Sequence, residues 1–142
     1  MSARDPVQAD AGDDVGRTRL GFQYVVLRCV PRVDREEFAN VGVVLYCQQR
    51  DYLAAGSHVV PDRLRALDLD VDVDAVASAL AAVAAVCRGD ASAGAAGAVP
   101  LGTRFGFLKA PRSTVVQPGP VHGGSTADPV AELDHLLDRL VR

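Results

Sequence analysis

Two apolar runs, residues 22–30 and 41–47, constrain the fold of this chain more than any other feature. Both runs are rich in β-branched and aromatic residues, which favour strands. Pro31 ends the first run, because proline has no N–H to donate to a strand ladder. The sequence therefore predicts an antiparallel hairpin with a polar connector. The second run is apolar on both faces apart from Gly42, which predicts a central strand with a bulge or a close backbone approach at that glycine.

After the hairpin, the pattern predicts one more strand and then mostly helices. Helices are indicated where apolar residues recur at helical spacing behind an Asp or a Pro. The predicted elements are a strand over residues 52–60, a short helix over 63–67, a helix over 75–88 capped by Asp74 and ended by Gly89, a flexible connector over 89–99, short strands over 105–108 and 113–117, a loop over 118–127, and a helix over 129–141 capped by Asp128.

This order of elements indicates an α+β fold. We expect an antiparallel sheet that is built on the N-terminal hairpin and covered by helices on one face. A doubly wound parallel sheet would require strands and helices to alternate, and here they do not. Residues 1–20 are polar and aperiodic, which predicts a disordered tail. The remaining residues 21–142 have the size of a single domain.

Composition narrows the classes of function. The formal net charge of −3 argues against nucleic-acid binding, which needs a clustered positive surface. No apolar run approaches the roughly 20 residues of a membrane span, so no membrane contact is expected. An odd number of cysteines and no signal peptide predict a cytoplasmic protein. The acids that alternate over residues 68–74 lack the Gly and the closing Glu of a calcium loop. No metal or cofactor is expected, and the thiols are predicted to be small buried side chains: Cys29, Cys47 and Cys87.

The hairpin connector carries the first candidate site. Arg28 lies late in the first strand, Arg35 and Glu37 lie in the connector, and Asn40 starts the second strand. A hairpin brings these groups to one end of the sheet, where guanidinium forks and an amide can hold a carboxylate, a phosphate or a partner's polar patch. In the alternative interpretation, Arg28 pairs with Glu37 and Asn40 ties the connector backbone, so that the group only organises the turn.

A second candidate lies in residues 101–127, which contain no acidic residue. Arg104 and Arg112 make this segment locally positive, and beside Arg28 they would form a cleft that attracts anions. Alternatively, they are separate solvated charges. The glycine-rich residues 122–126 could form an anion-binding nest, but no nucleophile motif accompanies them, and a mobile loop is the expectation.

The chain resembles a bacterial family known as DUF3037, a domain of unknown function. The resemblance rests on a hairpin motif and on a C-terminal helix, carried by Tyr24, Arg28, Pro31, Arg35, Glu37, Phe38, Asn40, Val41, Gly42 and Val43, and by Asp128, Pro129 and Leu133. It covers nearly the whole chain after the tail. The family is uncharacterised, so the resemblance implies no reaction. It does imply a link, through genomic context, to HipA-like Ser/Thr kinases, the type found in toxin–antitoxin pairs.

Two classes of function remain in view. The first is a non-catalytic partner-binding or regulatory module, favoured by a charged connector and the lack of paired catalytic groups, with a HipA-like kinase as the named partner. The alternative is a small anion-binding enzyme or metabolite sensor that uses Arg28, Arg35 and Arg112. We expect the first, and no residue is nominated as catalytic.

Overall fold

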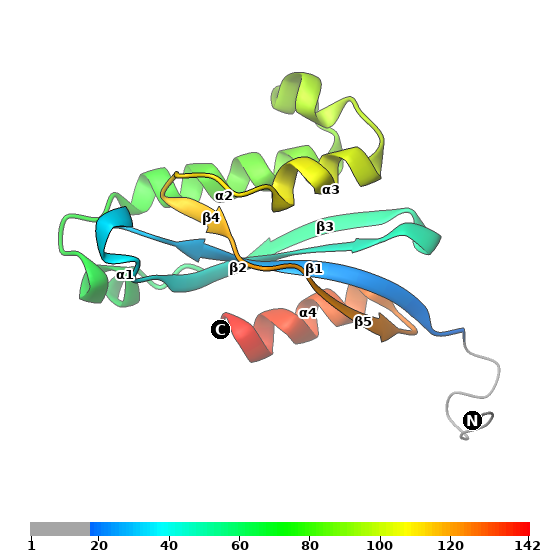
Figure 1. The fold of residues 1–142 in the computed structure, drawn as a ribbon, viewed down its shortest axis with the longest axis horizontal. Helices are drawn as coiled ribbons and strands as arrows, with labels where there is room; N and C mark the ends of the chain where they lie inside the picture. Colours follow the sequence, from blue (N-terminus) through cyan, green and yellow to red (C-terminus); the bar gives the residue numbers. More distant parts are fainter. Residues whose placement is uncertain (1–17) are drawn as a thin grey trace.

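The computed structural model of the chain describes residues 18–142. An antiparallel sheet of five strands forms its centre, in the order β3-β2-β1, with β4 and β5 both pairing with the far edge of β1 (Figure 1). The α+β class and the sheet founded on the N-terminal strands are thereby confirmed. The strands are β1 (Leu20–Cys29), β2 (Ala39–Cys47), β3 (Tyr52–Ser57), β4 (Val116–Pro118) and β5 (His122–Thr126). The tail expected over residues 1–20 lies mostly outside the described residues.

The predicted hairpin is present, and its bulge lies beside Gly42. β1 and β2 pair with Leu27 opposite Gly42 and Arg28 opposite Asn40, so the register shifts by one residue on β2. A Cβ at position 42 would lie 2.8 Å from the backbone oxygen of Gly56 on β3. Both predictions for Gly42, the bulge and the close backbone approach, are confirmed, because only a residue without a side chain allows this spacing.

In residues 18–142, seven helical segments connect and cover the strands. They are the 3₁₀ helices η1 (Val33–Arg35), η2 (Gln48–Arg50) and η3 (Ala91–Gly97), and the α-helices α1 (Pro61–Leu67), α2 (Val73–Arg88), α3 (Leu101–Lys109) and α4 (Pro129–Leu140). By length and composition, no single helix within residues 18–142 could cross a membrane. α2 and η3 reach the required apolar length only together, across a bend of 67°.

Several local predictions are wrong in the second half of the chain. Residues 105–108 belong to α3 rather than to a strand, because Phe105 and Leu108 lie one helical turn apart and are both buried. The connector over 89–99 contains η3, which packs against α2. In the segment 113–117, β4 begins only at Val116. The loop over 118–127 contains β5, which gains its ladder by pairing with the first half of β1.

Helices cover both faces of the sheet, not one as predicted (Figure 1). On β2, Val43 and Leu45 pack with Leu137 of α4, whereas Val44 packs with Leu80 of α2 on the opposite face. The physical reason lies in the strands themselves. A strand that is apolar on both faces must be covered on both, since exposed apolar area costs about 25 cal/mol per Å².

The helix ends agree largely with expectation. Asp128 caps α4 by accepting hydrogen bonds from two backbone N–H groups, and Gly89 ends α2 at a φ of 72°. The cap of α2 is Asp72 rather than Asp74, because the helix begins two residues earlier than predicted and Asp72 accepts from Ala75 N.

Candidate functional site

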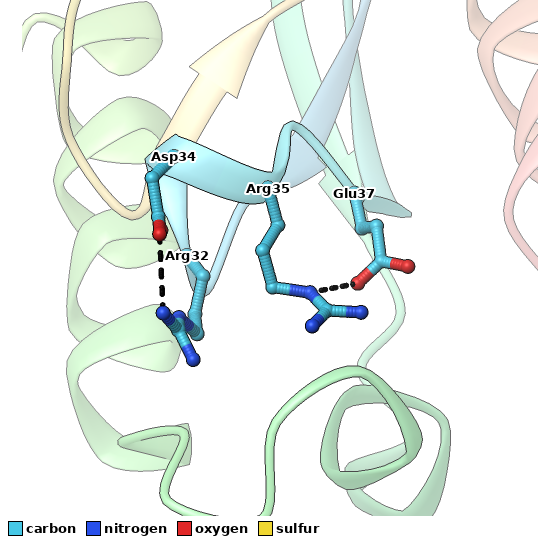
Figure 2. A network of polar contacts seen from close by, with 4 residues as sticks. All are labelled: Arg32, Asp34, Arg35 and Glu37. Carbon is cyan, nitrogen blue, oxygen red and sulfur yellow. Dashed lines mark hydrogen bonds and ion pairs between the residues drawn. The ribbon is translucent and has the colours of Figure 1, made fainter.

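The connector between β1 and β2 is held by two short-range ion pairs (Figure 2). Arg35 Nε donates to Glu37 Oε1 at 2.8 Å, and Arg32 Nη2 donates to Asp34 Oδ2 at 3.1 Å. The hydrogen bond from Arg35 lowers the pKa of the Glu37 carboxyl below its usual value. All four side chains are exposed, so these pairs contribute little to stability. Glu37 is therefore engaged by Arg35, and the alternative in which it pairs with Arg28 is wrong.

Arg28 has a different environment. It lies on β1 opposite Asn40 of β2 on one side and Gln117 of β4 on the other. Its guanidinium carbon is 4.1 Å from the ring centroid of Phe38, a cation–π distance. Its Nε is buried and donates to no acceptor. Within residues 18–142, no oxygen accepts a hydrogen bond from Arg28, so this cation is held in place by stacking and not by a counter-ion.

A glycine makes room for this guanidinium. A Cβ at Gly119 would lie 3.0 Å from Nε and 3.1 Å from the guanidinium carbon of Arg28. Gly119 N donates to Val26 O, which ties the backbone between β4 and β5 to β1 at this point. The Arg28 side chain therefore lies against backbone at Gly119 and beneath an aromatic ring at Phe38.

Arg28 lines a pocket of about 410 Å³ at the connector end of the sheet. Its walls come from β1, the connector and β4, and they combine apolar and polar groups. The other lining residues are Val30, Val33, Glu36, Phe38 and Gln117. Val33 and Phe38 are 52 % and 45 % exposed, so apolar surface continues from the pocket onto the connector. We call this set with Arg28 the Arg28 pocket.

The strained backbone of Glu36 in this pocket is explained by the turn. Glu36 has a φ of 56° directly after η1. Asp51 has a φ of 51° directly after η2, at the other hairpin of the sheet. The same 3₁₀ turn followed by a left-handed residue thus closes both hairpins, and the conformation carries no functional signal by itself.

Asn40 is used by the fold. Its Nδ2 donates to Leu140 O at 3.0 Å, and Arg63 Nη1 donates to Val141 O at 2.8 Å. These two side chains satisfy carbonyl groups that the end of α4 leaves without helical partners. Asn40 therefore joins the hairpin to the last helix, and does not tie the connector backbone as the alternative interpretation had it.

Arg104 and Arg112 do not join Arg28. Arg104 donates from Nε to Val99 O at 2.7 Å and from Nη1 to Cys87 O at 3.2 Å, so it ties α3 to the end of α2. Arg112 donates to Phe107 O and lines a separate pocket, which shares no residue with the Arg28 pocket. The structure thus brings Arg28, Arg35, Glu37 and Asn40 to one end of the sheet and leaves the two later arginines apart.

The remaining polar candidates have structural roles. No cluster of three metal-ligating side chains occurs in the described part of the chain. Asp68 and Asp72 accept hydrogen bonds from nearby backbone N–H groups. His122 lies on β5 and stacks on Tyr24 with ring centroids 5.2 Å apart. The three cysteines are free and buried, as predicted. Burial raises the pKa of the Cys87 thiol to about 11, so it stays protonated and unreactive at neutral pH.

Sequence reasoning missed three contributors to the Arg28 pocket. Phe38 belongs to the family motif, and an aromatic residue among charges in a connector is itself a signal for an exposed stacking partner. Gln117 and Gly119 lie within the acid-free segment 101–127, far along the chain from Arg28. Only the pairing of β4 with β1 brings them to Arg28, so no local pattern could have found them.

The comparison with protein-family models confirms the resemblance of the sequence. The model of the family described as "Protein of unknown function (DUF3037)" matches residues 24–141. The matched range contains the Arg28 pocket, both partners of the Asn40 bond and all of α4. No curated protein and no solved structure matches the chain.

Proposed function

This chain belongs to DUF3037, a family of unknown function, and from that premise we propose that it is a non-catalytic binding module that recognises a segment of a partner protein carrying a single carboxylate beside an apolar group. The observation that carries the proposal is the Arg28 guanidinium, which lines an open pocket and whose buried Nε finds no acceptor among residues 18–142. An unsatisfied buried donor costs about 1–3 kcal/mol. A site that retains such a donor is suited to a ligand that brings the acceptor.

The chemistry of the pocket fits a carboxylate beside an apolar group. Guanidinium presents a planar fork of donors that matches a carboxylate, and stacking on Phe38 holds the plane in one orientation. The exposed side chains of Val33 and Phe38 offer an apolar contact next to the charge. Arg and aromatic residues are also the types that dominate the energy of protein interfaces.

A protein partner is favoured over a free anionic metabolite by the position of the other arginines. A sensor that used Arg28, Arg35 and Arg112 together would need them in one pocket. Arg35 instead faces Glu37 at 2.8 Å, and Arg112 lines a different pocket. Glu36, the second charged residue of the Arg28 pocket, would repel a multiply charged anion. One cation therefore fits a single carboxylate that is part of a larger protein surface better than it fits a free anion with several charges.

The first partner to test is a HipA-like Ser/Thr kinase of the toxin–antitoxin type, to which the resemblance links this family, in the cytoplasm where the cysteine content predicts this protein to act. The two proteins would be co-expressed, and their affinity would be measured by titration calorimetry. Arg28→Met and Phe38→Ala are expected to weaken binding by about 30-fold or more, as for central interface residues. Arg35→Ala is the control for charge, because it removes one positive charge from the connector that follows β1 at a residue that does not line the pocket, and it is expected to change affinity less than about threefold.

Stability measurements keep the test interpretable. Arg28→Met removes the unpartnered donor and keeps the apolar length, so we expect the free energy of unfolding to stay within about 1 kcal/mol of the wild type. Equal affinities for Arg28→Met and the wild type would refute the assignment of the site. Absence of a complex at micromolar concentrations would remove the kinase as partner, and a melting temperature raised by carboxylate metabolites would move the proposal to the sensor alternative.

A further inference from the structure

A second pocket lies on the opposite side of the sheet from α4, among α2, η3, α3 and the segment that leads into β4. Its volume is about 620 Å³, within the roughly 300–1,000 Å³ of small-molecule sites in proteins. The walls are mostly small aliphatic side chains, among them Ala79, Ala82, Val83, Ala93 and Ala96. We call it the alanine pocket. None of its lining residues belongs to the Arg28 pocket.

The alanine pocket exists because the facing helices carry short side chains. Protein interiors are otherwise filled to the density of organic crystals. Here α2 presents Ala and Val to η3 and α3, and the ring of Phe107 at the pocket is 50 % exposed instead of filling it. An open hollow with apolar walls leaves hydrophobic area in contact with water, which is unfavourable until something covers it.

One cation marks the polar side of this pocket. Among the described residues that line it, Arg112 is the only charged one. Its guanidinium carbon is 4.8 Å from the Phe107 ring centroid, and its nitrogens donate to the carbonyl groups of Phe107 and Ala110. These contacts hold the guanidinium at the end of α3 without neutralising it. No carboxylate pairs with Arg112 within residues 18–142, and residues 101–127 contain no acid.

We propose that the alanine pocket binds a small amphiphile, with an aliphatic chain against the Ala and Val wall and a carboxylate head group on Arg112. The charge of the pocket selects the head group, because a lone cation beside apolar walls favours a single anion over a neutral or cationic group. The shape selects the chain, since short Ala side chains accept methylene groups and offer no hydrogen bond. The proposal is independent of the function assigned to the Arg28 pocket.

The test uses dodecanoate as the probe, kept below its micellar concentration, with calorimetry and thermal melting of the full chain. Binding to the wild type is expected, with a higher melting temperature. Ala82→Leu should weaken it, because Ala82 is exposed in the pocket wall and a larger side chain there takes up part of the space for the chain without disturbing the core. Arg112→Gln should weaken the binding of dodecanoate by about tenfold or more and leave the binding of its neutral analogue dodecanol unchanged. Arg139→Gln, on exposed α4 surface, is the charge-matched control and should bind as the wild type does.

Three outcomes would overturn the proposal. One is no binding of dodecanoate to the wild type at millimolar concentration. Another is binding that Ala82→Leu and Arg112→Gln leave unchanged, which would show nonspecific association elsewhere. The third is a concentration-dependent dimer that Ala82→Leu disrupts while dodecanoate has no effect, which would make the pocket an interface between two copies of this chain.

Discussion

Replacing Asn40 should destabilise the protein even though Asn40 lies at the candidate site. Its Nδ2 donates to Leu140 O at 3.0 Å in a half-buried position. Asn40→Ala removes a hydrogen bond with a net value of about 1 kcal/mol and leaves a carbonyl at the end of α4 without its donor, which costs about 1–3 kcal/mol when buried. Because solvent reaches part of this site, we expect a total loss of about 2 kcal/mol. For a domain of this size that lowers the melting temperature by roughly 6–10 °C.

Calorimetric melting and urea unfolding measure this loss directly. Asn40→Asp should destabilise at least as much at neutral pH, because a carboxylate would face the Leu140 carbonyl oxygen instead of donating to it. Arg142→Ala is the matched control at the same helix end. It removes ion pairs to Asp134 and Asp138 from a side chain that is 40 % exposed, and it should change the free energy of unfolding by less than about 0.5–1 kcal/mol. A melting temperature for Asn40→Ala within about 1 °C of the wild type would refute the reasoning and return Asn40 to the list of ligand-binding candidates.

Three further predictions follow from the backbone and the core. Gly42→Ala should lower the free energy of unfolding, measured in urea, by about 2 kcal/mol or more, because its Cβ would lie 2.8 Å from a backbone oxygen of β3. Gly106→Ala, whose Cβ would meet nothing within 4 Å, should instead raise it by about 0.5–1 kcal/mol by stabilising α3. Equal effects of the two substitutions would contradict this packing. Because Asp72 caps α2, Asp72→Ala should lower the free energy of unfolding by about 1 kcal/mol, and Asp74→Ala should lower it by less. The reverse order would show that Asp74 is the cap, as the sequence predicts. Cys87, buried and with its pKa raised to about 11, should react with iodoacetamide at pH 8 only after unfolding, and rapid labelling of the native protein would show that the site opens.

The hairpin and the helix ends were predictable because their signals are local. A β-branched run ended by Pro31 has few alternatives to a strand, and Gly42 in an apolar strand indicated the observed bulge. Asp128 followed by Pro129 has the chemistry of a helix start, and Gly89 has that of a helix end. Each of these signals acts within a few residues, so no knowledge of the rest of the chain was needed.

Apart from the cap of α2, the errors fall where a partner far along the chain decides the structure. Residues 105–108 form a short apolar run, and in a run of this length periodicity does not distinguish a strand from a buried helix. The helix is the form in which Phe105 reaches Tyr46, with ring centroids 5.3 Å apart. The glycines of β5 have a low intrinsic preference for strands. The free edge of β1 nevertheless pairs with β5, and the backbone hydrogen bonds of this pairing outweigh the local preference.

The candidate site shows the same division. Sequence reasoning placed Arg28, Arg35, Glu37 and Asn40 at one end of a sheet, because the connector of a hairpin joins the adjacent ends of two paired strands. It could not divide them by role. The distance from Arg35 to Glu37, and that from Asn40 to α4, depend on how the connector folds and on where the last helix docks.

The amino-acid sequence alone determined the α+β class, the founding hairpin, most helix ends and the presence of a cation at the hairpin end, since all of these follow from side-chain chemistry acting over a few residues. Only the tertiary structure decided that helices cover both faces, that Arg28 stacks on Phe38 with no counter-ion from residues 18–142, and that Arg112 belongs to another pocket. These outcomes depend on contacts between segments tens of residues apart, and such contacts are selected by the packing of the whole core and not by any local pattern.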